Sequence, residues 1–274
     1  MCQSRRARTL LDVVGANMLV KLQQKAGYQT VVSAEDSPLK YLKMDFLRLN
    51  STFHEYDGHT GEEEFLLDIL QGYCSILIER HDLQSQAYSL AREDVFVAPD
   101  AMFLPRHTRF LLTTTDAVEI AVLHAPADRD GKVEVISSNQ IVTKTVGKEN
   151  WSRDVRQVLP PESDSSRLIV GEIVCPRGNW SGFPAHKHDT ISENENALEE
   201  IYFYRLEPRH GYGIMRLYDR SFNELHLLEN DTAVIITRGY HSAVAAPHTR
   251  LFALWALAGR VKQYSVSLDP ETSI

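Results

Sequence analysis

The sequence has few cysteines, no long apolar run and no excess of positive charge, and each absence excludes a class of protein. Only three cysteines, widely spaced, occur among 274 residues, which favours reduced thiols in a cytoplasm over a disulfide framework. No apolar run reaches the roughly 18 residues that a spanning helix needs, so we expect no membrane segment. The net charge of −8 argues against a nucleic-acid partner, which normally meets a concentrated basic face.

A secretory signal is also lacking. Arg5, Arg6 and Arg8 precede a short apolar stretch, but Asp12 interrupts it and no small-residue cleavage pattern follows. Met18 opens a strand-like run. We therefore interpret residues 1–17 as an upstream extension or an arm.

Helical periodicity is scarce as well. Short apolar runs bounded by turn residues recur along the chain, as at 65–70, 73–78 and 94–99, and this spacing is typical of β-strands. The hydrophobic content of 43% indicates a folded core. We predict an all-β protein.

The order of strands in the first half repeats in the second. Residues 63–68 resemble residues 199–204, and residues 92–97 resemble residues 229–234. A repeat of about half the chain indicates duplication of a whole domain, because the repeats of solenoids are shorter.

The polar stretch 125–148 is the expected junction between the two copies. It divides the chain into a first domain at 1–145 and a second at 146–274. Ungapped alignment of the halves puts Leu104 at the position of His241. Since leucine cannot ligate a metal, we expect a metal site only in the second domain.

The second domain contains the most informative pattern, the His-x-His formed by His186 and His188. Alternate residues of a strand project to one face, so the two imidazoles converge. Glu200 opens the next predicted strand and His241 follows a later turn. Together they can complete a shell of three nitrogens and one oxygen for a divalent metal, with positions left for substrate.

A short motif of this kind also arises by chance in a chain with eleven histidines. Here it follows a turn-rich approach at 178–184, and predicted strands at 197–204 and 232–236 surround it. This is the layout of a cupin barrel. We therefore predict two tandem cupin (jelly-roll β-barrel) domains, with a catalytic metal site in the second.

Several motifs together resemble one known family. They are Gly178-Asn179-Trp180-Ser181, Pro184-x-His186-Lys187-His188-Asp189, Leu198-Glu199-Glu200-Ile201-Tyr202, Gly211-x-Gly213, Arg216-x-Tyr218 and Arg238-Gly239-Tyr240-His241. On these motifs the chain resembles the 5-deoxy-glucuronate isomerase family of bacterial inositol catabolism. The likeness covers nearly the whole chain and is strongest from Arg153 to Gly259.

The resemblance implies an aldose–ketose isomerase that interconverts the sugar acids 5-deoxy-D-glucuronate and 5-dehydro-2-deoxy-D-gluconate. Moving a carbonyl by one carbon requires removal of a neighbouring proton, and negative charge then develops on adjacent oxygens. A divalent ion held by the four predicted ligands can stabilise that charge. Zinc is the preferred ion, and manganese, iron and nickel suit the same shell.

Strand alternation distinguishes the residues around the predicted ligands. Glu200, Tyr202 and Tyr204 share one face and Glu199 lies on the other, so Glu200 is the expected ligand. Core packing explains Tyr204 at least as well as a role in the site. Tyr202, nearer the metal, is expected to shuttle a proton or to hydrogen-bond the substrate.

A sugar acid also needs its carboxylate held, and a planar guanidinium does so with two parallel hydrogen bonds. Arg216 is the candidate, since an arginine inside a strand is costly unless paired; a salt bridge on the outer barrel wall is the alternative. Tyr240 and Arg238 precede His241 and are expected to line the mouth of the barrel. Asp189 is expected to orient a ligand imidazole.

Other functions stay open at this point. An iron-dependent cupin dioxygenase uses a similar shell, and a related 4-deoxy-5-keto-uronate isomerase of pectin breakdown is the nearest competitor. A sugar-sensing or storage cupin has no need of an intact ligand quartet. The general base stays open too, and a hydride shift needs none. We expect a cytoplasmic homo-oligomer, because self-association covers exposed strand edges.

Overall fold

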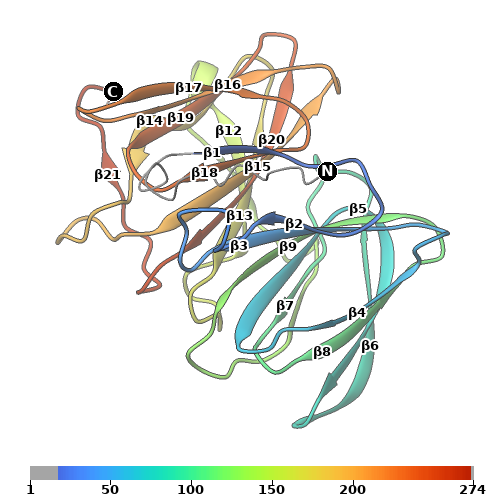
Figure 1. Ribbon diagram of the computed structural model, residues 1–274. Coiled ribbons are helices and arrows are strands. Elements are labelled where there is room, and N and C mark those ends of the chain that lie inside the picture. The colour runs from blue at the N-terminus through green and yellow to red at the C-terminus, as the bar shows by residue number, and fades with distance from the viewer. Residues whose placement is uncertain (1–17, 273–274) are drawn as a thin grey trace, which may run out of the picture.

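The computed structural model of the protein describes residues 18–272, so the predicted extension at 1–17 lies outside the described residues. Within them the chain forms strands and only one short helix, the single-turn 3-10 helix η1 (Glu149–Trp151) (Figure 1). The predicted all-β class is confirmed. No helix in the described part is long and apolar enough to cross a membrane.

The strands follow one another along two halves of the chain. Those of the first half are β1 (Met18–Lys21), β2 (Gly27–Val32), β3 (Lys43–Leu49), β4 (Glu55–His59), β5 (Glu63–Arg80), β6 (Leu83–Arg92), β7 (Ala101–Leu104), β8 (Arg109–Thr113), β9 (Val118–Pro126) and β10 (Glu134–Ile136). Those of the second half are β11 (Thr143–Val146), β12 (Arg153–Leu159), β13 (Ile169–Cys175), β14 (Trp180–Lys187), β15 (Glu199–Glu207), β16 (Gly213–Tyr218), β17 (Asn223–Leu228), β18 (Thr232–Ile236), β19 (Tyr240–Ala245), β20 (Arg250–Ala258) and β21 (Ser267–Leu268).

The first half forms one sheet that closes over its own core. Strands β10-β7-β5-β9-β3-β2 run in that order. The C-terminal half of β5 pairs with β6 and β8, and β8 pairs in turn with β4. Within β5, Gly72 has a φ of +100°, and a Cβ at that position would lie 2.1 Å from the carbonyl oxygen of Ala117. Only glycine fits there.

The second half forms a barrel from two facing sheets. One has the order β1-β18-β15-β20-β13-β12-β11 and the other β17-β16-β19-β14-β21. The outermost strand of the first of these is β1, from the opposite end of the chain, which pairs with β18. A division at residue 145 therefore does not separate the sheets: β1 belongs with the second barrel, and β11 spans the boundary.

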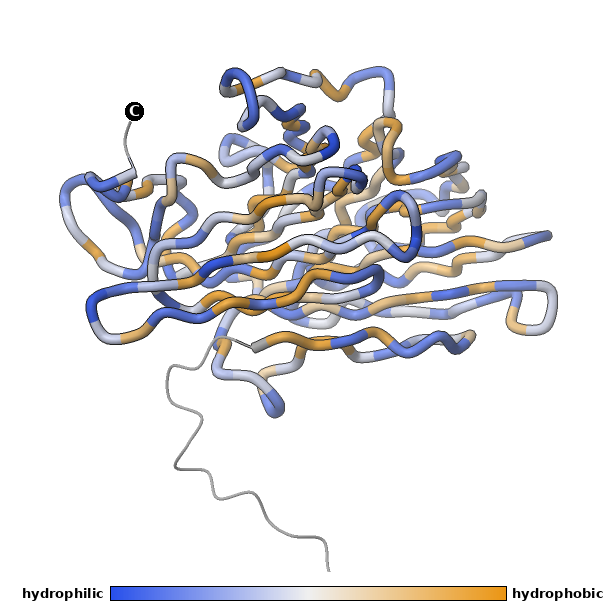
Figure 2. Tube along the Cα trace, turned by 90° about the horizontal axis from the view of Figure 1, so that it is seen from above, coloured by the Kyte–Doolittle hydropathy of each residue, from blue (hydrophilic) through white to orange (hydrophobic). Residues whose placement is uncertain are grey.

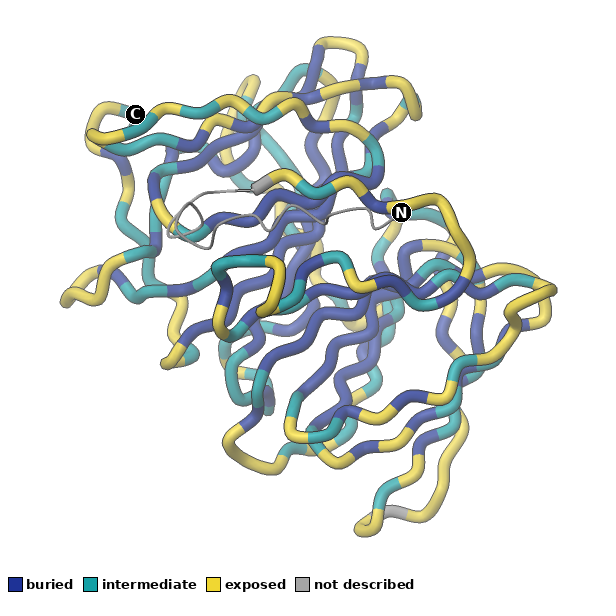
Figure 3. The backbone as a smooth tube through the Cα atoms, in the orientation of Figure 1, coloured by how far each residue is buried: buried dark blue, intermediate teal, exposed yellow. Residues whose placement is uncertain are grey.

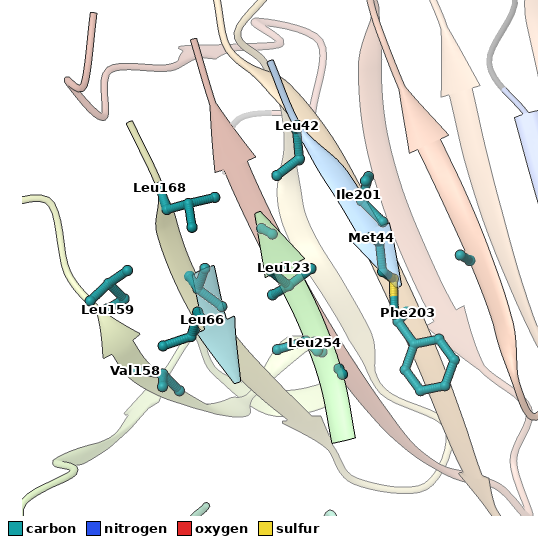
Figure 4. Close-up of a cluster of buried hydrophobic side chains, with 14 of the residues drawn as sticks. Leu42, Met44, Leu66, Leu123, Val158, Leu159, Leu168, Ile201, Phe203 and Leu254 are labelled. Carbon is teal, nitrogen blue, oxygen red and sulfur yellow. The ribbon is translucent and has the colours of Figure 1, made fainter. Parts of the chain in front are cut away.

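The two barrels pack sheet against sheet through a shared apolar core (Figure 4). Its labelled side chains come from both halves of the chain: Leu42, Met44, Leu66 and Leu123 from the first, and Val158, Leu159, Leu168, Ile201, Phe203 and Leu254 from the second. Along β15 the alternate residues turn the other way, into the second barrel. Apolar, buried strands occupy the middle of the molecule, with polar, exposed turns at its edges (Figures 2 and 3).

A buried ion cluster crosses the same junction. Arg92, at the end of β6, forms two hydrogen bonds with the Glu172 carboxylate on β13, at 2.7 and 2.9 Å. Arg156 donates to the same carboxylate at 3.1 Å, and Asp68 lies 3.3 Å from Arg92. Removing one member of such a cluster leaves a buried charge without its partner, so the cluster constrains how the barrels meet.

Candidate metal centre

Three strands of the second barrel deliver the four predicted ligands to one place. His186 is the last residue but one of β14, and His188 follows directly after the strand, which ends at Lys187. Glu200 lies on β15, and His241 lies on β19 as the register partner of His186. The irregular pairing between Ser181 and His186 marks a bulge in β14, a feature that commonly re-aims side chains near functional sites.

The three imidazoles lie close together, and Glu200 contacts two of them. The available ring nitrogens of the three histidines all lie within 4.8 Å of one another. Glu200 Oε2 lies 3.0 Å from His188 Nε2 and 3.1 Å from His241 Nε2. His188, Glu200 and His241 are buried, and His186 is partly exposed. Glu199 points away, and its carboxylate accepts the backbone N–H groups of residues 40–42.

Backbone carbonyls orient the imidazoles. His188 Nδ1 is 2.9 Å from the carbonyl oxygen of Leu198, and His241 Nδ1 is 3.3 Å from that of Gly239. With Nδ1 as donor, Nε2 is left as the nitrogen that faces the centre. The expected role of Asp189 is corrected here: its carboxylate accepts hydrogen bonds from Lys187 Nζ, at 2.7 Å, and from the Gly239 N–H, also at 2.7 Å.

The electrostatics of His186 and Glu200 favour the forms that bind cations, whereas at His188 burial is outweighed by Glu200, which raises the pKa of that imidazole. Burial and the neighbouring His241 and His188 lower the pKa of His186 to about 3. Burial would raise the pKa of Glu200, but His241 and His188 outweigh it and hold that pKa below the ordinary range. His186 is therefore neutral and Glu200 ionised at neutral pH, as metal ligation requires.

One atom points directly to a missing partner. His241 Nε2 is buried and makes no hydrogen bond of good geometry, although Glu200 Oε2 is 3.1 Å away. Buried polar atoms are normally satisfied, and a divalent ion among three imidazoles and a carboxylate would satisfy this one. The residues present thus fit a divalent metal ion in a mixed nitrogen and oxygen shell.

The two tyrosines that share the face of Glu200 have different surroundings. The Tyr202 ring lies 6.2 Å from that of His241, and its hydroxyl interacts electrostatically with Glu200. The hydroxyl of Tyr204 instead points at Met215 Sδ, 3.7 Å away in the apolar core. Tyr202 therefore borders the centre, and Tyr204 packs below it.

The structure does not bring Arg216 or Tyr240 to the histidines. Arg216 is exposed, donates to Asn223 at 2.9 Å and covers the Tyr218 ring at 3.9 Å. Tyr240 also contacts Tyr218, with ring centroids 5.7 Å apart. Both placements correct the sequence-based prediction, because alternation along β16 and β19 sends these side chains to the outer face.

The first barrel has a different residue at the carboxylate position. Phe65 pairs with Leu104 and with a residue of β9, as Glu200 pairs with Ile236 and with a residue of β20. Phe65 therefore corresponds to Glu200, and Leu104 to Ile236 instead of His241. The ungapped alignment slipped because turn lengths differ between the halves. Among the described residues, the histidine trio of the second barrel is the only metal-binding group found.

Two residues beside the centre were missed in the sequence. Arg153 and Tyr264 both interact electrostatically with Tyr202, and Tyr264 also with Glu200. For Arg153 the available signal was its spacing of two residues from Val155, which puts both on one face of β12. Tyr264 lies in a segment without regular structure, where periodicity carries no information.

Comparison with known proteins agrees with this geometry. The sequence profile of the KduI/IolB family matches residues 18–273. The 5-deoxy-glucuronate isomerase of Geobacillus kaustophilus is 31% identical over 217 residues, 77% of this chain and 78% of that protein. The crystal structure of an IolB-like protein from Salmonella typhimurium superposes with a TM-score of 0.87 at 27% identity, covering 94% of this chain and 98% of the other.

A more distant structure defines the fold. Oxalate decarboxylase from Lactobacillus farciminis superposes with a TM-score of 0.62 at 8% identity, over 91% of this chain and 86% of that one. At this identity the likeness shows the fold alone, and it confirms the predicted pair of cupin barrels. With a family profile that spans nearly the whole sequence, and with the candidate ligands gathered in the second barrel, this chain belongs to the KduI/IolB family.

Proposed function

We propose that this protein is a 5-deoxy-glucuronate isomerase, which interconverts 5-deoxy-D-glucuronate and 5-dehydro-2-deoxy-D-gluconate in myo-inositol catabolism. The observation that carries the proposal is the gathering of three imidazoles, two of them in contact with the buried Glu200 carboxylate, in a chain whose curated relatives bear this name. A divalent metal ion held by His186, His188, Glu200 and His241 would supply Lewis-acid stabilisation of the charge that develops on the substrate oxygens.

Tyr202 is the residue proposed to handle a proton. Burial and the charge of Glu200 hold the pKa of its hydroxyl well above 10, so the hydroxyl stays protonated at neutral pH. In that form it donates a hydrogen bond or a proton to a substrate oxygen. This electrostatic setting supports the role of acid over that of general base.

The test is a direct assay of the purified protein on two uronates, 5-deoxy-D-glucuronate and the 4-deoxy-5-keto-uronate of pectin breakdown, with oxygen uptake recorded in parallel. The proposal expects turnover of the first, at least tenfold less of the second and no oxygen consumption. Preference for the pectin-derived uronate would refute the substrate, and oxygen uptake would refute the reaction class. Deuterium uptake from solvent distinguishes proton transfer from a hydride shift.

Zinc is the proposed ion, because tetrahedral or five-coordinate sites rich in imidazole suit it. Metal analysis of the purified protein should give one zinc per chain. A chelator should abolish activity, and added zinc should restore it. Recovery with manganese or iron and not with zinc would identify a different ion while leaving the site intact.

A homo-oligomer in the cytoplasm is proposed as the working form. Strand β17 lies at an edge of its sheet, and Leu225 and Leu227 on it are 70% and 54% exposed. Apolar side chains on an open edge favour association with another copy. Cys74 and Cys175 are buried free thiols, which suits a reducing compartment. Light scattering at several concentrations measures the oligomeric state.

A further inference from the structure

Arg153 opens β12 with its side chain directed toward the second barrel. The strand alternates, so Arg153 shares its face with Val155, which packs against the core of that barrel. The guanidinium lies over the ring of Trp151, 5.8 Å from its centroid, and that ring contacts Phe183 at 5.9 Å. Phe183 precedes His186 on β14. These contacts place Arg153 and Trp151 against β14, the strand that carries His186.

No carboxylate within the described residues pairs with Arg153. Its Nη1 donates to the carbonyl oxygen of Trp151 at 3.2 Å, and its Nε is buried without a hydrogen-bond partner. Arg92 and Arg156, by contrast, both pair with the Glu172 carboxylate, although Arg156 Nε also lacks a hydrogen-bond partner. A half-buried guanidinium with donors to spare is costly to keep unless something else completes it.

The groups that face Arg153 are neutral. They are Cys175, Tyr202 and Tyr264. Thiols and phenols are uncharged at neutral pH, and burial raises the pKa of Cys175 further, to about 12. None of the three carries negative charge at neutral pH. The positive charge of Arg153 therefore has no counterion on this side of the barrel.

We propose that Arg153 binds the carboxylate of the sugar-acid substrate, the task that the sequence had suggested for Arg216. The inference rests on the proposed function and adds the orientation in which the substrate binds. The carbonyl end lies at the histidines and Glu200, the carboxylate end lies at Arg153, and Tyr202 lies between them. A guanidinium fork suits a carboxylate because it can form two parallel hydrogen bonds.

The test compares Arg153→Met, Arg153→Lys and the control Arg216→Met, which removes an arginine from the outer face. Each protein is assayed on 5-deoxy-D-glucuronate and on its uncharged methyl ester. Arg153→Met should lower kcat/KM for the acid by about 10- to 100-fold, the worth of hydrogen bonds to a charged group, and leave the ester nearly unchanged. Arg153→Lys keeps the charge but loses the fork, and should fall between. Arg216→Met should match the wild type on both.

A binding measurement separates this inference from the proposed reaction. Calorimetry with D-glucuronate and its methyl ester needs no turnover. Wild type should prefer the acid and Arg153→Met should not, even if 5-deoxy-D-glucuronate proves not to be the substrate. An unchanged preference for the acid in Arg153→Met overturns the inference, and so does a wild type without any preference.

The Tm of the variants distinguishes substrate binding from a purely structural role of Arg153. Because the guanidinium has no acidic partner, Arg153→Met should keep the Tm of the wild type within a few degrees. Two results together would mean that the side chain supports the barrel instead of binding the substrate. They are a large fall in the Tm of Arg153→Met, and an Arg153→Lys variant that is stable and selects the acid over the ester as strongly as wild type.

Discussion

Glu199 and Glu200 are sequence neighbours with opposite tasks. Glu200 turns into the second barrel, where it contacts His188 and His241. Glu199 turns to the inter-barrel side and accepts three backbone N–H groups of the first half of the chain. The period of two along a strand produces this division, so at this scale the carboxylate of the centre could be chosen from the sequence.

Tyr202 and Tyr204 offer a matched pair of substitutions at the residue scale. Tyr202→Phe removes the hydroxyl that borders Glu200 and should lower kcat by about 10²-fold, the usual worth of a positioned acid. Tyr204→Phe removes a hydroxyl that faces only Met215 and should leave kcat within about twofold. Steady-state kinetics measures both. Equal losses in the two variants would contradict the placement of Tyr202 at the centre.

Glu199 joins elements that are distant in the sequence, β15 and the segment before β3. Glu199→Ala removes the acceptor for the N–H groups of residues 40–42, at 2.7 to 3.0 Å. We expect the free energy of unfolding to fall by about 2–4 kcal/mol, since hydrogen bonds to a charged group are lost. Urea unfolding measures it. Glu207→Ala, at the exposed end of the same strand, is the control and should cost less than about 0.5 kcal/mol. A similar loss in both would remove the special role of Glu199.

A polar cluster inside the first barrel links three elements, β3, β5 and β9. His124 lies between Asp45, 2.7 Å from Nε2, and Glu63, 2.6 Å from Nδ1; Lys43 and Tyr28 face the same cluster. Burial would lower the pKa of His124, but the hydrogen bonds to Asp45 and Glu63 raise it. Burial would raise the pKa of Glu63, but His124 and Lys43 lower it to about 2.

These opposite shifts predict how stability depends on pH. The raised pKa of His124 gives stabilisation that is fully present below pH 6.5, its unfolded value, and is lost as pH rises through the folded pKa. The lowered pKa of Glu63 gives stabilisation that is present above pH 4.5 and is lost as pH falls toward 2. Urea unfolding should therefore show this contribution greatest between about pH 4.5 and 6.5. His124→Phe should flatten the decline on the alkaline side, and an unchanged profile would contradict the assignment.

At the scale of the whole molecule, the buried ion cluster around Arg92 determines how firmly the barrels are joined. Arg92→Met leaves Asp68 and Glu172, both fully buried, without their main partner, and should cost about 3–5 kcal/mol. Arg109→Met removes an exposed arginine paired with Asp57 and should cost less than about 1 kcal/mol. Denaturant midpoints compare the two. A loss in Arg92→Met no larger than in Arg109→Met would show that the apolar core alone holds the junction.

One strand belongs to the barrel of the other half of the chain. Strand β1 lies near the start of the sequence but completes a sheet of the second barrel through its pairing with β18. No local pattern announces such exchanges, because any exposed edge with free N–H and C=O groups accepts a strand. The sequence could therefore predict two barrels but not the membership of their outer strands.

By itself the sequence determined the β class, the doubling of the barrel and the candidate ligands His186, His188, Glu200 and His241, because strand alternation and turn chemistry act over a few neighbouring residues. Only the tertiary structure decided which arginine turns into the second barrel. Arg216 and Arg153 both lie in strands, and the face that each presents depends on which sheet packs against it, a long-range contact that no local period encodes.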